Sequence, residues 1–190
     1  MADAEKRAMS VEEFLQWNLS QDRRYELVDG YPVPLRALAG ATAQHDTVVV
    51  NLVGLLGTQL RGNECRPRTA NTAVRTKINC ARRPDVTIES APLVLGALEA
   101  RKPIAVFEVL SPTTRKIDRS VRLQEYRRHP GLRTIVHIDP DEMDVLVYTR
   151  NVTGDWDDER FEQPETTIRI ADMPVALRLA DVYDGVPVRV

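Results

Sequence analysis

Two acidic residues lie in otherwise apolar segments of the sequence. Glu108 is in the middle of the run Ile104-Ala105-Val106-Phe107-Glu108-Val109-Leu110, which is rich in β-branched and aromatic residues, and Asp85 is in a shorter strand-like segment, 83–88. Burying one ionised carboxylate costs several kcal/mol unless a cation, hydrogen-bond donors or a metal compensates. If the two segments pair as strands, Asp85 and Glu108 lie side by side. Such a pair of hard oxygen ligands would suit Mg²⁺ or Mn²⁺.

Basic residues flank these acids in the sequence, although the formal net charge is only -2. Segment 61–83 carries seven basic residues and one acid, and segment 115–133 carries seven basic residues and two acids. Segment 139–165 has the opposite balance, with ten acids and two basic residues. Two basic segments around the acids are what a phosphate-binding cleft requires, but ordinary solvated surface charge explains them as well.

Several other chemistries are excluded because the motifs that they require are absent from the sequence. The segment Gly54-Leu55-Leu56-Gly57 lacks the lysine and hydroxyl of a phosphate-binding loop, no serine lies in a Gly-x-Ser-x-Gly motif, and the three histidines do not have zinc-ligand spacing. Cys65 and Cys80 are too few for a disulfide framework. We therefore interpret them as free thiols in a reducing compartment.

The sequence predicts a cytoplasmic protein with no membrane contact. Its N-terminal residues lack the apolar core of a signal peptide. The most apolar run, 48–60, is too short to cross a membrane and is interrupted by two glycines and an asparagine.

The elements that must position the two acids can be recognised from their patterns. Ser10 and Glu13 have the spacing of a capping box that begins a short helix to about residue 19, and Asp29-Gly30 predicts the turn of a β-hairpin. Apolar periodicity predicts a helix over 42–60 that packs on a sheet, and a second helix over 117–128. Further strands are expected at 65–68, 73–78, 134–138, 145–148 and 167–170, and a last apolar segment covers 175–179.

Alternatives remain open for the residues around the acids. Glu26 either joins an acidic group or is the exposed side of an edge hairpin, and Asp85 has Arg82 and Arg83 as local partners. Arg122 shares one helix face with Asp118 and Tyr126, so it can also be an ordinary partner of Asp118. We interpret His45 as a capping or surface residue of the first helical turn rather than as a ligand.

A set of motifs resembles the Uma-two family of restriction endonucleases over about residues 11–182. The motifs that carry the resemblance are Tyr25-Glu26-Leu27-Val28-Asp29-Gly30, His45, Arg83-Pro84-Asp85-Val86, Phe107-Glu108-Val109-Leu110-Ser111-Pro112-Thr113-Thr114, Asp118, Tyr126 and Ile138-Asp139-Pro140. The family is placed in the PD-(D/E)xK nuclease superfamily. The resemblance implies an α/β (α+β) fold with a restriction-endonuclease-like mixed β-sheet flanked by helices, an N-terminal hairpin and a C-terminal β-hairpin extension. The length of the chain fits one domain, expected over 10–190 after a flexible segment 1–9.

The resemblance also implies a metal-dependent DNA endonuclease. Asp85 and Glu108 would hold Mg²⁺ or Mn²⁺, and Glu26 would complete the acidic group. The lysine of the superfamily pattern would fall at Leu110, and in this family it appears instead at the position of Arg122. Arginine stays charged, so it can stabilise negative charge but cannot transfer a proton. A nuclease fold without catalysis, acting as a nucleic-acid-binding or protein-interaction module, is therefore the alternative.

The remaining expectations concern binding. Tyr126 and Asp118 would hold the side chain of Arg122. By analogy with nucleases that cut duplexes, the chain would form a homodimer. The residues that would contact DNA phosphates are Arg66, Arg68, Arg75, Lys77 and Arg115.

Overall fold

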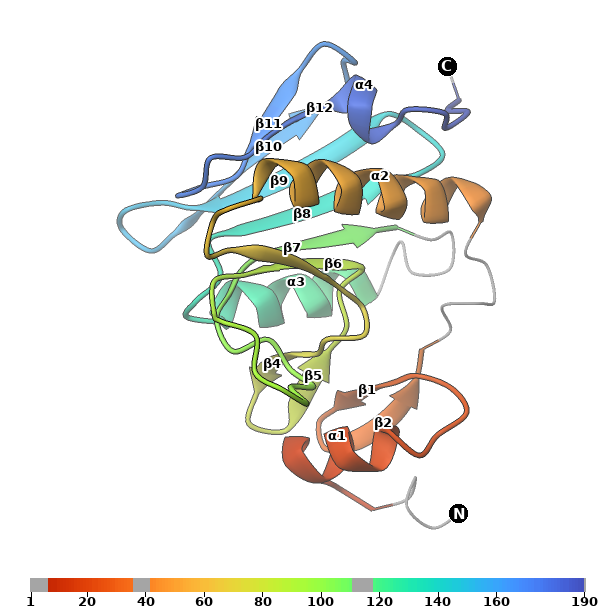
Figure 1. Ribbon diagram of the computed structural model, residues 1–190, viewed down its shortest axis with the longest axis vertical. Coiled ribbons are helices and arrows are strands. Elements are labelled where there is room, and N and C mark those ends of the chain that lie inside the picture. Colours follow the sequence, from red (N-terminus) through yellow and green to blue (C-terminus); the bar gives the residue numbers. More distant parts are fainter. Residues whose placement is uncertain (1–6, 36–41, 111–117, 190) are drawn as a thin grey trace.

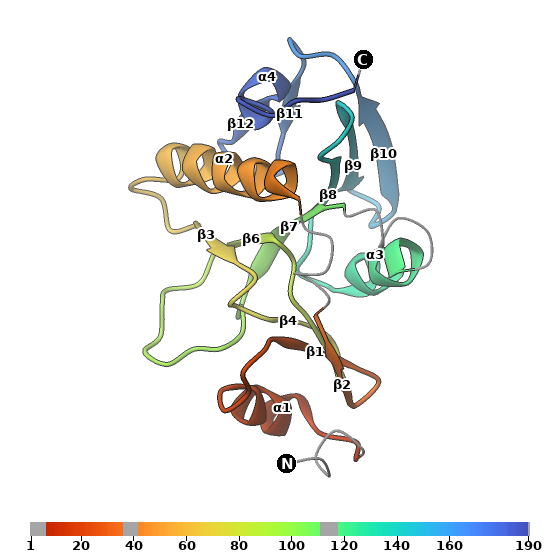
Figure 2. The same ribbon diagram turned by 90° about the vertical axis from the view of Figure 1, so that its right-hand side faces the viewer.

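The chain folds around a central six-stranded sheet with a helix on each face (Figures 1 and 2). The computed structural model describes residues 7–35, 42–110 and 118–189, with only the backbone described at 118 and 119. The strand order is β10-β9-β8-β7-β6-β3, in which only β7 and β8 are parallel. These strands are β3 (Arg66–Thr69), β6 (Val86–Glu89), β7 (Pro103–Val109), β8 (Thr134–Asp139), β9 (Asp144–Arg150) and β10 (Trp156–Phe161).

Helix α2 (Ala43–Gln59) covers one face of this sheet. Its Val48, Leu52 and Leu56 are fully buried, one helical turn apart, and pack in one cluster with Phe107 of β7 and Val136 of β8. The expected packing of this helix against the sheet is confirmed. The small sheet β11 (Thr167–Arg169) and β12 (Ala176–Arg178) and the short helix α4 (Leu179–Val182) extend the same apolar cluster.

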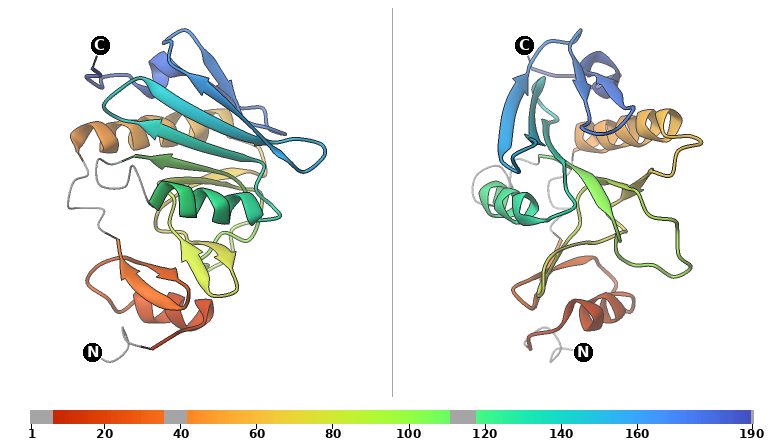
Figure 3. Two further views of the ribbon diagram at one scale, coloured as in Figure 1. Left: turned by 180° about the vertical axis from the view of Figure 1, so that it is seen from behind. Right: turned by 90° about the vertical axis from the view of Figure 1, so that its left-hand side faces the viewer.

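Helix α3 (Asp118–Arg128) lies across the opposite face of the sheet, as Figure 3 shows from behind. Its Tyr126 packs with Val106 of β7 and Ile135 of β8. Side chains alternate between the two faces of a strand, so Phe107 faces α2 while Val106 and Glu108 face α3. Glu108 therefore lies under the helix that carries Arg122.

A second, four-stranded sheet joins the N-terminal hairpin to two later strands, in the order β2-β1-β5-β4, and is called the N-terminal sheet below. It consists of β1 (Tyr25–Val28), β2 (Tyr31–Pro34), β4 (Val74–Lys77) and β5 (Cys80–Arg82), with helix α1 (Val11–Asn18) packed on β1. Asp29 and Gly30 both have positive φ, as a tight hairpin turn requires. The capping box is present, because Ser10 Oγ accepts the Glu13 N–H and the Glu13 carboxylate accepts the Ser10 N–H.

The expected mixed sheet flanked by helices is confirmed. The sequence did not show which strands share a sheet. The segments 65–68 and 73–78, which look alike in sequence, belong to different sheets, because β3 pairs with β6 while β4 pairs with β5. Met9 is buried and donates its N–H to Gly30, so packing begins before Ser10. The division into one domain over 10–190 stays a prediction.

Among the described residues, no helix has the length and apolar character that crossing a membrane requires.

Candidate active site

Asp85 and Glu108 are brought together by the pairing of β6 with β7. The strands are antiparallel with Val86 opposite Phe107, and this register places Asp85, the residue before β6, across from Glu108. The Asp85 carboxylate accepts the backbone N–H of Val109 at 2.8 Å. The predicted pairing of these strands is therefore confirmed, while the metal-binding role of the two acids stays a prediction.

Glu108 is almost completely buried. Burial raises its pKa to about 7; Arg122 and the Tyr126 hydroxyl act against this shift, whereas the charges of Asp85 and Glu26 add to it. The Tyr126 hydroxyl donates to Glu108 Oε1 at 2.6 Å, and Arg122 Nη1 lies 3.5 Å from the same oxygen. The raised pKa indicates that these partners do not fully compensate the charge of the ionised carboxylate.

His45 is a polar neighbour that the sequence reasoning missed. It lies in the first turn of α2, where its backbone N–H is capped by Thr42 Oγ1, and its Nε2 is 3.5 Å from Asp85 Oδ1. Burial lowers the pKa of His45, but its contact with Asp85 and the charge of Glu108 outweigh burial and raise the pKa overall. Its presence among the family-like motifs was the available signal; its position in a first helical turn pointed only to capping.

The donor set fits a divalent cation of the magnesium type. Among the described residues, no group of three or more histidine, cysteine, aspartate or glutamate side chains is spaced to hold a metal. Mg²⁺, however, is commonly held by one or two carboxylates and completes its shell with water and substrate phosphate. Asp85 and Glu108 supply two such carboxylates, and the raised pKa of Glu108 marks a place where a cation would be stabilised.

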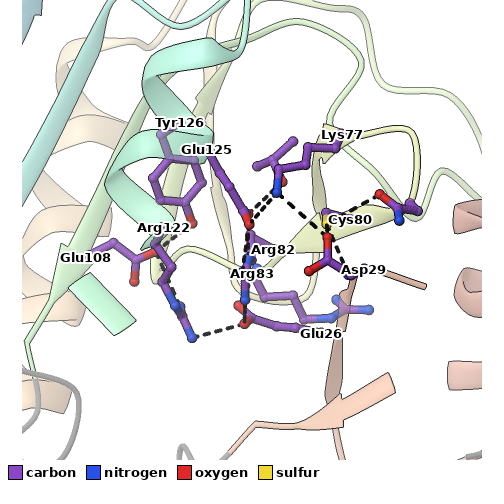
Figure 4. Close-up of polar contacts among 12 residues, drawn as sticks. Glu26, Asp29, Lys77, Cys80, Arg82, Arg83, Glu108, Arg122, Glu125 and Tyr126 are labelled. Carbon is purple, nitrogen blue, oxygen red and sulfur yellow. Dashed lines mark hydrogen bonds and ion pairs between the residues drawn. The ribbon is translucent and has the colours of Figure 1, made fainter. Parts of the chain in front are cut away.

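Glu26 is buried and surrounded by donors, which excludes the expectation that it is the exposed side of an edge hairpin (Figure 4). Its Oε1 accepts the backbone N–H of Arg83 at 2.9 Å. Its Oε2 accepts a hydrogen bond from Arg82 Nη1 at 3.1 Å and lies 3.0 Å from Arg122 Nη2. Arg122 thus bridges Glu26 of the N-terminal sheet and Glu108 of the central sheet.

The residues expected to hold Arg122 are placed differently. The Tyr126 hydroxyl contacts Glu108, the acid that Arg122 also approaches. Asp118 begins α3, but its side chain lies outside the described part of the chain.

The basic residues expected to contact DNA mostly have partners within the protein. Arg66 donates to the Leu60, Asn63 and Cys65 carbonyls after the end of α2. Arg68 pairs with Glu89, Arg75 with Glu99 and Glu12, and Lys77 with Glu125 and Asp29. Arg115 lies outside the described residues. Of the four that are described, Arg66 is exposed, and about a third of the side chain is accessible in both Arg75 and Lys77.

The mixed sheet flanked by helices defines an α+β fold, and a comparison with known protein families places the chain in one of them. The profile of the Uma2 family, described as "Putative restriction endonuclease", matches residues 11–181. The chain belongs to this family.

Two further proteins are similar to the chain. An uncharacterized protein of Synechocystis, slr1290, is 28% identical over 153 residues, covering 78% of this chain and 77% of that protein. A crystal structure from Anabaena variabilis, described as "a putative nuclease", superposes with a TM-score of 0.73 over 92% of this chain and 97% of that chain, at 18% identity. At that identity the likeness establishes the fold alone.

Proposed function

We propose that the protein is a metal-dependent endonuclease that hydrolyses phosphodiester bonds in DNA. The observation that carries this proposal is the placement of Asp85 across from Glu108 on paired strands. The family agrees with this proposal, and so does the burial of Glu108, whose raised pKa indicates a carboxylate charge that its neighbours do not fully compensate.

Each side chain has a distinct part in this proposal. Asp85 and Glu108 hold Mg²⁺ or Mn²⁺ through their carboxylates. The metal, when bound, supplies an activated water and stabilises the leaving phosphate oxygen. Arg122 stabilises the negative charge that develops on the phosphate, and its permanent charge excludes it as a general base.

The DNA-binding part of the proposal rests on the more exposed basic side chains. Arg66 is exposed and donates to backbone carbonyls. Arg75 and Lys77 would exchange carboxylate partners for phosphates, which is a smaller gain than binding from a free basic surface. Affinity should still fall steeply with salt, since each phosphate contact releases counterions. A cytoplasmic location and a homodimer stay predictions.

Plasmid cleavage tests the proposal. Purified protein with Mg²⁺ or Mn²⁺ should convert supercoiled plasmid to nicked or linear DNA, while EDTA and Glu108→Ala should prevent it. Glu89→Gln is a matched control: Glu89 is also a buried glutamate bound to an arginine and to a backbone N–H, but it lies at the other end of β6. Unchanged plasmid over a wide range of enzyme and metal concentration would count against the proposal.

A second candidate is a nuclease fold that binds nucleic acid or a protein without cleaving. It is favoured by Arg122 at the position where the family resemblance implies a lysine, and by the contacts of this arginine with two glutamates. DNA binding without cleavage, together with nicking by Arg122→Lys, would support it. A wild-type protein that cleaves while Glu108→Ala does not would eliminate it.

A further inference from the structure

Four charged side chains between the N-terminal sheet and α3 form a series of three ion pairs, which the backbone of α3 closes into a ring (Figure 4). Starting on α3, Arg122 contacts Glu26 of β1, Glu26 contacts Arg82 of β5, and Arg82 contacts Glu125, which returns to α3 three residues after Arg122. Glu26, Arg82 and Glu125 are each at most 3% exposed. Three of the four members are therefore shielded from solvent, while the Arg122 side chain is 15% exposed. Salt screens buried ion pairs much less than exposed ones.

Arg82 is the rigid member of this ring. Its Nε and Nη2 donate to the two carboxylate oxygens of Glu125 at 2.7 and 3.0 Å, and its Nη1 donates to Glu26. Planar two-point pairing of this kind fixes orientation as well as distance. Glu26 is therefore held from one side by Arg82 and from the other by the backbone N–H of Arg83.

Glu26 separates two like charges. Burial lowers the pKa of Arg82, and the nearby charge of Arg122 lowers it further, but the pairing with Glu125 and Glu26 outweighs both and raises the pKa overall. Removing the charge of Glu26 would leave the two guanidinium groups to repel one another, and Arg122 would lose its contact with the N-terminal sheet. The carboxylate oxygens of Glu26 already receive three donors, which leaves it poorly suited to bind a metal.

We propose that Glu26 is a positioning residue and not a metal ligand: fixed by Arg82, it holds the Arg122 guanidinium next to Glu108, where a substrate phosphate would lie beside a metal held by Asp85 and Glu108. The inference deepens the proposed function and rests on it for the identity of the phosphate. It gives the N-terminal sheet a part in the chemistry, because the side chain that aims Arg122 comes from that sheet.

The kinetic test uses Glu26→Gln in the full chain. At saturating plasmid, kcat should fall by about 10- to 100-fold, as for loss of an orienting contact, while the Mg²⁺ concentration for half-maximal rate changes by less than about threefold. A metal ligand would give the reverse result, a large shift in the Mg²⁺ requirement. Glu89→Gln, which removes a similarly buried and similarly bonded carboxylate, should leave both quantities unchanged.

A second measurement does not depend on cleavage. In the metal-free ¹⁵N-labelled protein, the guanidinium signals of Arg122, assigned by their loss in Arg122→Lys, should shift and exchange faster in Glu26→Gln but not in Glu89→Gln. If the wild type fails to cleave and this NMR result holds, the endonuclease proposal fails while the positioning of Arg122 stands. Unaltered Arg122 signals in Glu26→Gln, or a Mg²⁺ requirement shifted tenfold or more, would overturn the inference. Arg82→Lys, which keeps the charge but loses the two-point pairing, should produce the same NMR change and serves if Glu26→Gln does not fold.

Discussion

The two faces of the central sheet carry side chains of different polarity, although the same strands supply both faces. Toward the middle of α2 the contacts are apolar, such as Leu52 and Leu56 against Phe107. Toward α3 the apolar contacts of Tyr126 share the surface with buried charges, above all Glu108. An apolar face needs only complementary shape, whereas each buried charge needs a partner in a particular place. The α2 face therefore supports the fold, and the α3 face carries the potential for chemistry at a cost in stability.

The largest effect is expected for Glu108→Gln on the α3 face, which should reduce cleavage without reducing stability. Cleavage should fall by about 100- to 1000-fold or more, because the amide cannot replace a charged ligand. The free energy of unfolding at pH 8 should stay the same or rise, since the change removes a carboxylate whose pKa burial raises to about 7. Plasmid cleavage and urea denaturation measure the two effects. A large loss of stability at pH 8 would mean that the charge at this face stabilises the fold.

The converse experiment is Leu52→Ala on the α2 face. The cavity left by this fully buried side chain should lower the free energy of unfolding by about 2–5 kcal/mol. Cleavage measured well below the melting temperature should remain close to that of the wild type. Val50→Ala on the exposed side of the same helix is the control, with an expected change of less than about 0.5 kcal/mol. Lost cleavage in a folded Leu52→Ala protein would show that the faces are coupled.

The pH dependence of stability should also differ between the faces. Glu108 has a folded-state pKa of about 7, above the ordinary value of 4.5, so between these values the folded state binds more protons than the unfolded state. In the metal-free protein, the stability contributed by protonated Glu108 is complete below pH 4.5 and is lost as pH rises to about 7. Urea denaturation across this range should show a shallower decline in Glu108→Gln than in the wild type, whereas Leu52→Ala should keep the wild-type slope. Equal slopes in wild type and Glu108→Gln would contradict the raised pKa.

The smallest effect is expected for Tyr126→Phe, which keeps the ring in the core and removes one hydrogen bond to Glu108. Stability should fall by about 1 kcal/mol. Because the Tyr126 hydroxyl lowers the pKa of Glu108, its removal should raise that pKa further. A ¹³C NMR titration of the Glu108 carboxyl group in the metal-free protein measures the change, and an unaltered midpoint would exclude the hydroxyl as a partner.

The difference between the faces also sets the limit of prediction from sequence. Apolar periodicity and local capping signals identified helix 42–60 and the Ser10–Glu13 capping box, because these depend on neighbours along the chain or on simple burial. The pairing of the Asp85 and Glu108 strands was posed only as a condition, which the structure meets. The ring through Glu26, Arg82 and Glu125 could not be predicted, since it joins residues distant in sequence and leaves no periodic pattern.

The basic segments illustrate the same limit. Segment 61–83 has a strong positive balance in the sequence, yet Arg68 meets Glu89 and Arg75 meets Glu99, both acids from outside that segment. Local charge counts therefore overstate the free positive charge that a polyanion would encounter. His45 was missed for a related reason, because its proximity to Asp85 arises from the packing of α2 on the sheet.

Strand β10 closes the central sheet at one end, and four of its six side chains, Asp157, Asp158, Glu159 and Arg160, are exposed. A free edge strand invites pairing with another chain, and this strand presents three carboxylates that another molecule's acidic edge would repel. The same carboxylates would turn a nucleic acid away from this side of the molecule. The acidic border thus discourages aggregation through β10.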